Sequence, residues 1–193
     1  MLWKHSNSHD VAEAMALLPI ITAPDPRLKK LSKPVDKVDE EAGRLMDDML
    51  ETMYAAPGIG LAAPQVGVLK RVIVVDVAEK DSEAEPLMLA NPELTWVSDE
   101  DAGYEEGCLS LPEHYAEVIR PAAIKLRYLD RQNEVRELAA EGLLATCIQH
   151  EIDHLDGILF VDHLSALKRN MILRKLLKVK KAEKGSQKEP AAV

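Results

Sequence analysis

A chain of 193 residues, 47% of them hydrophobic and 30% charged, can fold as one domain with its own core, and this composition excludes wholesale disorder. The formal charge of −9 disfavours binding of nucleic acid by the whole surface, but it is uneven: from Leu164 onward nine basic and two acidic residues give +7, so the preceding part carries −16. Two cysteines make no disulfide framework, and no apolar stretch approaches the roughly 18 residues that span a membrane, so we expect a cytoplasmic protein with reduced thiols.

The first 36 residues contain little that predicts regular structure. Residues 1–14 are polar and patternless, and we expect a flexible leader or tag there, although His5 and His9 offer the alternative of a metal-binding arm. Three prolines keep residues 22–36 extended or turning.

The first helix is predicted from about Asp39 to Ala55. Apolar side chains, several of them methionines, recur there at three- and four-residue steps, and Asp36 or Asp39 can cap the start. A Pro-Gly pair then ends the helix. Small residues crowd the next stretch, GIGLAAPQVG at 58–67, which is either a tight turn or a place where another backbone or a ligand approaches closely.

The middle of the chain predicts strands. They are short, close together and joined by turn-like segments, which favours antiparallel or mixed sheets. We expect strands at Arg71–Ala78, Leu87–Ala90, Leu94–Val97, Ala116–Ile119, Ile124–Leu129 and Val135–Ala139.

Two further helices complete the predicted fold. One spans about Gly142 to Leu155, and a basic one begins near His163 and runs toward Val179. The fold class is then α+β, with short sheets packed around a central helix, an N-terminal helix and a C-terminal helix. Residues 15–180 would form a single catalytic domain, and we expect a disordered tail at 181–193.

The central helix contains the motif His150-Glu151-Ile152-Asp153-His154, which reads H-E-x-x-H. Residues four apart lie on one face of a helix, so both imidazoles can bind one metal ion. Glu151 is then near enough to take a proton from water at that ion. The alternative is a solvated helix in which this pattern arose by chance.

A reactive metal site needs a third protein ligand, and the residues leave several candidates: both cysteines, His114, His163 and the carboxylates. Cys147 shares the helical side of His150 but lies seven residues from His154, roughly 10 Å along the axis. It is therefore a better wall of the pocket than a ligand. Cys108 follows a strand end that breaks at glycine, a suitable place to aim a side chain.

Three segments together resemble the signature motifs of peptide deformylases, in the same order and with sensible spacing. They are GIGLAAPQ at 58–65, EGCLS at 106–110 and QHEIDH at 149–154. The resemblance covers about residues 16–180, and no motif position departs from the family pattern.

The resemblance implies a complete active site. Cys108, His150 and His154 would bind one divalent metal ion, with Fe²⁺ expected in the cell and Zn²⁺, Ni²⁺ or Co²⁺ as replacements. Glu151 would be the general base, and the Gln65 amide with the Leu109 backbone N–H would stabilise the oxyanion. The reaction implied is hydrolysis of the N-formyl group from the initiator methionine of new polypeptides, releasing formate.

The substrate would be a nascent formyl-methionyl peptide. By the same resemblance and by helical position, Ile59, Leu143 and Cys147 are expected to line the methionine pocket, with Tyr104 as a weaker candidate. The glycine-rich stretch that includes Gly60 would pair with the peptide as an added strand. His114 and His163 are interpreted as surface or capping residues.

The basic C-terminal helix has two interpretations: a solvated helix that packs its apolar side inward, or a contact with ribosomal RNA. Two rival functions stay open. A zincin-type metalloprotease would take its third ligand, a Glu or His, downstream of H-E-x-x-H, and here His163 falls after the Asp156-Gly157 break. A non-catalytic, metal-stabilised RNA- or ribosome-binding module would not need Glu151. We expect a monomer without membrane association.

Overall fold

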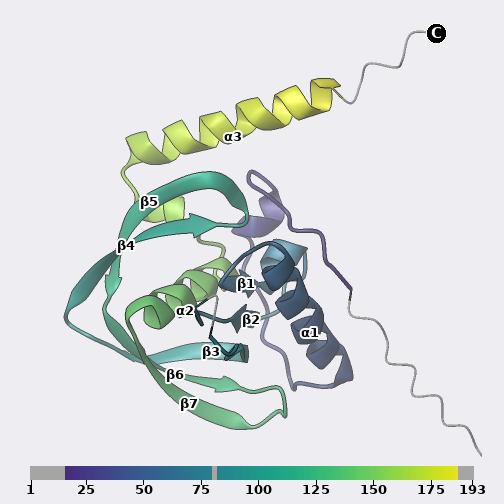
Figure 1. The fold of residues 1–193 in the computed structure, drawn as a ribbon, viewed down its shortest axis with the longest axis vertical. Coiled ribbons are helices and arrows are strands. Elements are labelled where there is room, and N and C mark those ends of the chain that lie inside the picture. Colours follow the sequence, from purple (N-terminus) through teal and green to yellow (C-terminus); the bar gives the residue numbers. More distant parts are fainter. Residues whose placement is uncertain (1–15, 80–81, 187–193) are drawn as a thin grey trace, which may run out of the picture.

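The computed structural model describes residues 16–79 and 82–186, with side chains to residue 182, so the leader expected at 1–14 lies outside the described residues (Figure 1). The helices are α1 (Glu40–Ala55), α2 (Gly142–Leu155) and α3 (Ala166–Ser186), with short 3-10 helices η1 (Pro26–Lys29), η2 (Ala63–Val66) and η3 (Phe160–His163). The strands are β1 (Gly60–Ala62), β2 (Val72–Val75), β3 (Leu87–Val97), β4 (Asp101–Cys108), β5 (Leu111–Pro121), β6 (Ala123–Leu129) and β7 (Val135–Glu141).

The strands form two sheets, and every pairing between these named strands is antiparallel. A five-stranded sheet has the order β1-β2-β3-β6-β7, and β4 with β5 forms a separate two-stranded ribbon. Figure 1 shows α2 enclosed between this ribbon and the larger sheet. The predicted α+β class with a central helix is confirmed.

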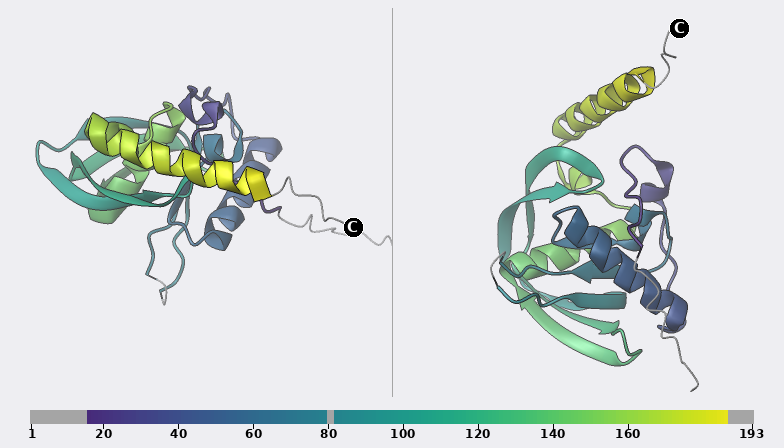
Figure 2. Two further views of the ribbon diagram at one scale, coloured as in Figure 1. Left: turned by 90° about the horizontal axis from the view of Figure 1, so that it is seen from above. Right: turned by 45° about the vertical axis from the view of Figure 1, so that its right-hand side comes forward.

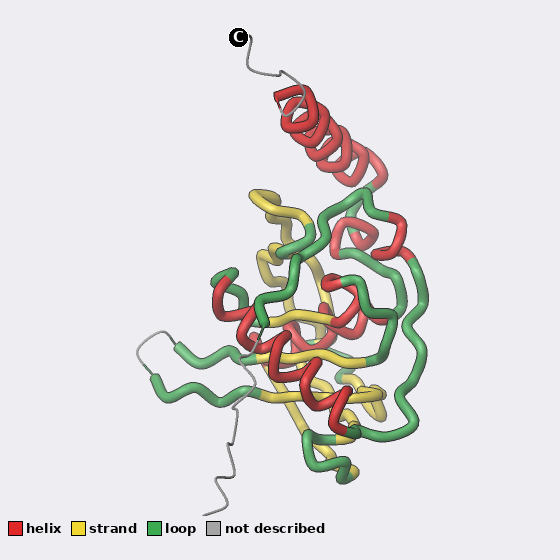
Figure 3. The backbone as a smooth tube through the Cα atoms, turned by 90° about the vertical axis from the view of Figure 1, so that its right-hand side faces the viewer, coloured by secondary structure: helices red, strands yellow, loops and turns green. Residues whose placement is uncertain are grey.

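Helix α1 forms where the apolar period predicted it. Asp39 caps its start, accepting a hydrogen bond from the backbone N–H of Ala42 at 3.1 Å, because the first helical N–H groups have no partner within the helix. Met46, Met49 and Met53 are fully buried against the larger sheet, and Figure 3 shows α1 crossing that sheet. The methionines fill core space, as flexible unbranched side chains can.

Helix α2 is buried on nearly all sides. Ten of its residues are buried, and one face packs Ala145, Ile148 and Leu155 onto the larger sheet. Its end is fixed at Gly157, which has φ +73 and whose added Cβ would stand 2.8 Å from the carbonyl of Lys29. Only glycine tolerates both the left-handed conformation and this close approach.

The strand predictions were incomplete. The strands expected at 87–90 and 94–97 are one strand, β3, interrupted by a register shift at Asn91-Pro92, because proline cannot donate to the ladder. β1 was not predicted at all, and β4 was expected only as a strand end. The β4 sequence DAGYEEGC contains mainly residues of low strand propensity, and pairing with β5 along its length holds it extended.

Helix α3 lies at one end of the molecule and extends beyond its body (Figure 2). Ile172 and Leu176 bury its inner side against a cluster that includes Phe160. The helix runs to Ser186, so the disordered tail predicted from 181 is wrong for 181–186. The segment 181–184 consists of good helix formers, namely two lysines, an alanine and a glutamate. None of the described helices is long and apolar enough to cross a membrane.

Candidate metal centre and active site

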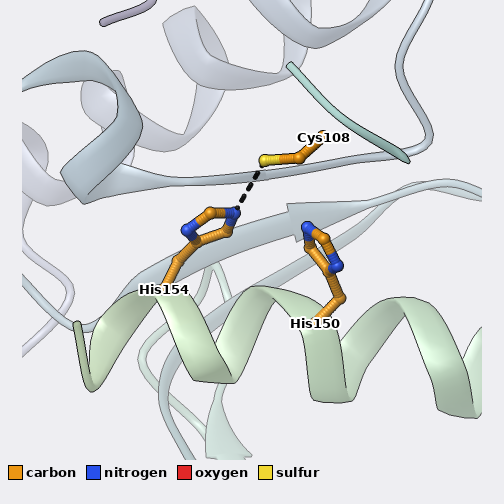
Figure 4. A group of neighbouring side chains, drawn as sticks. All are labelled: Cys108, His150 and His154. Atoms are coloured by element: carbon orange, nitrogen blue, oxygen red, sulfur yellow. Dashed lines mark hydrogen bonds between the residues drawn. The ribbon is translucent and has the colours of Figure 1, made fainter. Parts of the chain in front are cut away.

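The end of β4 and the middle of α2 bring three candidate metal ligands together. Cys108, His150 and His154 each offer one ligand atom, and these atoms all lie within 4.8 Å of one another (Figure 4). Cys108 Sγ is 3.2 Å from His154 Nε2. The two imidazoles rise from the same face of α2 because their residues are four positions apart.

A buried carboxylate orients the first imidazole. Glu106 Oε2 lies 2.7 Å from His150 Nδ1, so the Nε2 atom of that ring is left for the cluster. Arg120 donates to the same carboxylate through Nε at 2.6 Å and Nη2 at 3.0 Å. Burial raises the pKa of Glu106, but the hydrogen bonds from His150 and Arg120 outweigh it and hold that pKa at about 2. Glu106 is therefore ionised.

The donor set fits one divalent metal ion. A thiolate and two neutral imidazoles are ligands that zinc and ferrous iron accept, and three protein ligands leave a position open. Burial lowers the pKa of His154 well below its usual value, which keeps this ring neutral as a ligand must be. Its Nδ1 atom is buried without a hydrogen-bond partner among the described residues.

Glu151 lies beside this cluster in an environment suited to proton transfer. Its side chain is buried, and Oε2 has no hydrogen-bond partner among the described residues. Burial raises the pKa of Glu151 to about 7. A carboxyl group with such a pKa can both take and return a proton near neutral pH.

Gln65 reaches the cluster from η2. Its Oε1 accepts the backbone N–H of Ala62 at 2.8 Å, which fixes the amide. Nε2 then donates toward Ser110 Oγ at 3.2 Å and Cys108 Sγ at 3.5 Å. The amide of this buried residue is thus held with its donor end at the candidate ligand. Leu109, next to Cys108, lines the same space.

A cavity of about 420 Å³ opens onto these groups. All four residues expected to contact substrate line it: Ile59, Gly60, Leu143 and Cys147. Gly60 also makes the close approach that the small residues of this stretch suggested, because an added Cβ would stand 2.4 Å from Glu151 Oε1. Tyr104 and His114 line the cavity too.

The comparisons with known proteins agree with one another. Residues 17–170 match the family model of polypeptide deformylase. A peptide deformylase of Phenylobacterium zucineum is 61% identical over 168 residues, which cover 87% of this chain and 99% of that protein. The crystal structure of peptide deformylase from Ehrlichia chaffeensis has a TM-score of 0.83 and 41% identity, covering 87% of this chain and 99% of that one. A second structure of peptide deformylase from that organism, in complex with actinonin, has a TM-score of 0.81 and 43% identity, and the match covers 85% of this chain and 98% of that one.

The chain belongs to the polypeptide deformylase family. The resemblance inferred from the three motifs is confirmed, and the protein is a hydrolase that acts on N-formylated peptides. Deformylases depend on a metal, and the Cys/His/His group of this chain can hold one.

Several residues around the deformylase site were not singled out from the sequence. Glu106 belongs to the EGCLS motif, but nothing local marks its partner Arg120, which is buried on β5. Arg120 Nη1 also donates to Asp153 Oδ2 at 2.8 Å, and His163 Nε2 lies 2.7 Å from the same oxygen. His163, expected to be a surface or capping residue, is exposed, and it is also bonded to the motif helix.

Proposed function

We propose that the cavity hydrolyses the N-formyl group of formyl-methionyl polypeptides and releases formate. The observation that carries this proposal is one arrangement of three candidate metal ligands, two of which, Cys108 and His150, line the cavity. Glu151 lines the same cavity, and its buried Oε2 atom has no hydrogen-bond partner among the described residues. The domain responsible is residues 15–180, and the enzyme acts in the cytoplasm as a monomer on newly synthesised chains.

Cys108, His150 and His154 would hold the metal, and Fe²⁺ is the proposed ion in the cell, with Zn²⁺, Ni²⁺ or Co²⁺ able to replace it. A divalent ion bound there supplies Lewis acidity, which lowers the pKa of water and polarises a carbonyl group. The Glu106 carboxylate makes the imidazole of His150 a better ligand by accepting from its other nitrogen. Metal analysis of anaerobically purified protein, with formate release measured on the same sample, tests the identity of the ion.

Glu151 is the proposed proton carrier. It takes the proton of the attacking water as the oxygen bonds to the formyl carbon, and it passes that proton to the nitrogen as the C–N bond breaks. A folded-state pKa near 7 suits both steps, because the group is then a mixture of carboxylate and acid at neutral pH. The cleaved peptide leaves with a free amino group.

Gln65 and the backbone N–H of Leu109 are the proposed donors to the developing oxyanion. The amide of Gln65 is already oriented by its bond to Ala62, so it needs no reorganisation when charge develops. Loss of one such donor typically costs a factor of about 100 or more in turnover. Gln65→Ala should therefore retain metal and lose most of its activity.

The formylated methionine would lie against Ile59, Leu143 and Cys147. Burial raises the pKa of the Cys147 thiol well above its usual value, so it is a neutral apolar wall, and its Sγ donates to the Ile59 carbonyl at 3.4 Å. Gly60 begins β1, an outer strand of the larger sheet, which leaves one backbone edge for an added peptide strand. Backbone pairing of this kind tolerates many sequences after the methionine.

Formate release from formyl-Met-Ala, with no cleavage of a blocked internal peptide, tests the function against the metalloprotease alternative. Glu151→Gln should keep the fold and the metal but lose turnover. Full function in that variant would instead favour a non-catalytic, metal-stabilised ribosome-binding module.

We also propose that α3 contacts ribosomal RNA. Four exposed basic residues lie in the C-terminal half of the helix: Arg174, Lys175, Lys178 and Lys181. Their replacement by glutamine leaves the buried side of α3 intact, so it should weaken co-sedimentation with ribosomes at low salt without changing turnover of a short peptide. Unchanged co-sedimentation would refute the contact.

A further inference from the structure

The short helix η3 contacts the motif helix α2 at both of its ends. Its first residue, Phe160, stacks with the ring of His150 (drawn in Figure 4), with 6.3 Å between the ring centroids and 23° between the ring planes. Its last residue, His163, lies with Nε2 at 2.7 Å from Asp153 Oδ2. The function proposed above uses neither Phe160 nor His163.

A continuous network of hydrogen bonds runs from His163 to the ring of His150. His163 Nε2 and Arg120 Nη1 share one oxygen, Asp153 Oδ2, at 2.7 and 2.8 Å. Arg120 also donates twice to Glu106, at 2.6 and 3.0 Å. Glu106 Oε2 lies 2.7 Å from His150 Nδ1. The network therefore joins η3, α2, β5 and β4 around one candidate metal ligand.

The network is most buried near the candidate ligand and reaches solvent at His163. The side chains of Glu106 and Arg120 are 5% and 6% exposed. That of Asp153 is 17% exposed, and that of His163 is 35% exposed. A buried guanidinium group is costly unless acceptors meet its nitrogens, and here Asp153 is the acceptor for Nη1. A displaced Asp153 would therefore loosen Arg120.

Asp153 is the member of the network that solvent can reach and displace. A side chain held by one donor keeps more rotational freedom than one held by two. His163 supplies the second donor from outside the helix, because a carboxylate oxygen accepts and Nε2 must then donate. His163 thus limits the rotation of Asp153 toward water.

We propose that His163 is a positioning residue for the metal centre. By fixing Asp153, it keeps Arg120 bonded to Glu106. Glu106 in turn holds Nδ1 of His150 and leaves Nε2 of that ring for the metal. The proposal rests on the metal ligands assigned in the proposed function.

The test measures the affinity of the folded protein for Co²⁺ by competition with a chelator, and records the visible absorption of bound Co²⁺, which responds to ligand geometry. His163→Leu removes the donor. It should weaken the affinity by about three- to tenfold, less than the 10- to 100-fold that direct partners of a ligand give. The absorption should shift. For formyl-Met-Ala, kcat should fall and KM should stay constant, because His163 is not among the residues that line the cavity.

Two further variants separate the hydrogen bond from the bulk of the ring. His163→Gln keeps a neutral N–H donor near the position of Nε2, so it should restore the Co²⁺ affinity to within about twofold of the wild type. His163→Asn holds its amide closer to the backbone, out of reach of Asp153, and should behave like His163→Leu. Lys168→Leu changes an exposed residue in the first turn of α3 and is the matched control, with wild-type affinity and absorption. Urea unfolding of each metal-free variant establishes that it is folded.

Wild-type affinity and absorption in His163→Leu would overturn the proposal. Equal losses of affinity in the Gln and Leu variants would also overturn it, because the loss would then come from the missing ring rather than from the hydrogen bond. Wild-type Co²⁺ affinity in His150→Ala would instead refute the proposed metal centre. The two failures are thus distinguishable.

Discussion

Replacement of Gly60 by alanine tests whether β1 holds Glu151 in its working position. An added Cβ would stand 2.4 Å from Glu151 Oε1 and 2.8 Å from Cys147 Sγ, whereas ordinary contacts begin at 3.4 Å. The carboxylate must therefore retreat by about 1 Å, and it is buried with little space to do so. A misplacement of about 1 Å in a catalytic group can cost a factor of about 100.

We expect Gly60→Ala to lower kcat/KM for a formyl-Met peptide by about 100-fold. Its metal content should equal that of the wild type, because Gly60 lies against none of the three candidate ligands in the contacts described. Overpacking should lower the free energy of unfolding by about 1–3 kcal/mol. Thermal unfolding and metal analysis on the same preparation separate lost activity from lost fold.

The matched control is Gly103→Ala. The nearest atoms to its added Cβ are Glu117 Oε1 and Ile119 Cδ1, both at 3.0 Å and both at the ends of exposed, flexible side chains. This variant should keep its melting temperature and its activity. A folded, metal-loaded Gly60→Ala enzyme with more than a third of wild-type kcat/KM would refute the reasoning.

Three further predictions follow from buried or strained positions. In metal-free protein the folded state keeps the Glu151 proton up to about pH 7, whereas the unfolded state loses it above about pH 4.5, so the free energy of unfolding falls as pH rises toward 7. Glu151→Gln should remove this fall. Urea unfolding should then show a free energy of unfolding about 3 kcal/mol above that of the wild type at pH 8, and no difference at low pH. Glu106→Gln removes the negative charge that accepts hydrogen bonds from Nε and Nη2 of the buried Arg120 side chain. It should lower the free energy of unfolding by about 3–5 kcal/mol and metal affinity by about 10- to 100-fold, measured by chelator competition. Gly157→Ala should lower stability by about 2 kcal/mol or more in calorimetry without changing the active site, because φ is +73 and the new Cβ meets the rigid backbone of Lys29.

Local sequence predicted the helices better than the strands. The start of α1 at Asp39 and the extent of α2 follow from capping and from apolar periodicity, which act over a few residues. β1 was missed and β4 was predicted only as a strand end, because short, glycine-containing or acidic segments become strands only when a partner strand pairs with them.

The sequence by itself determined the chemistry available to this protein: the two histidines of H-E-x-x-H share one helical face, and the three motifs indicate the family. Spacing left several candidates for the third ligand, and only the resemblance assigned that role to Cys108. The tertiary structure decided which distant residues share the site, because β4 packs against α2 and brings Cys108 within 4.8 Å of the imidazoles. It also buried Arg120 against Glu106. This pair cannot be predicted from local pattern, since it depends on which strands lie side by side.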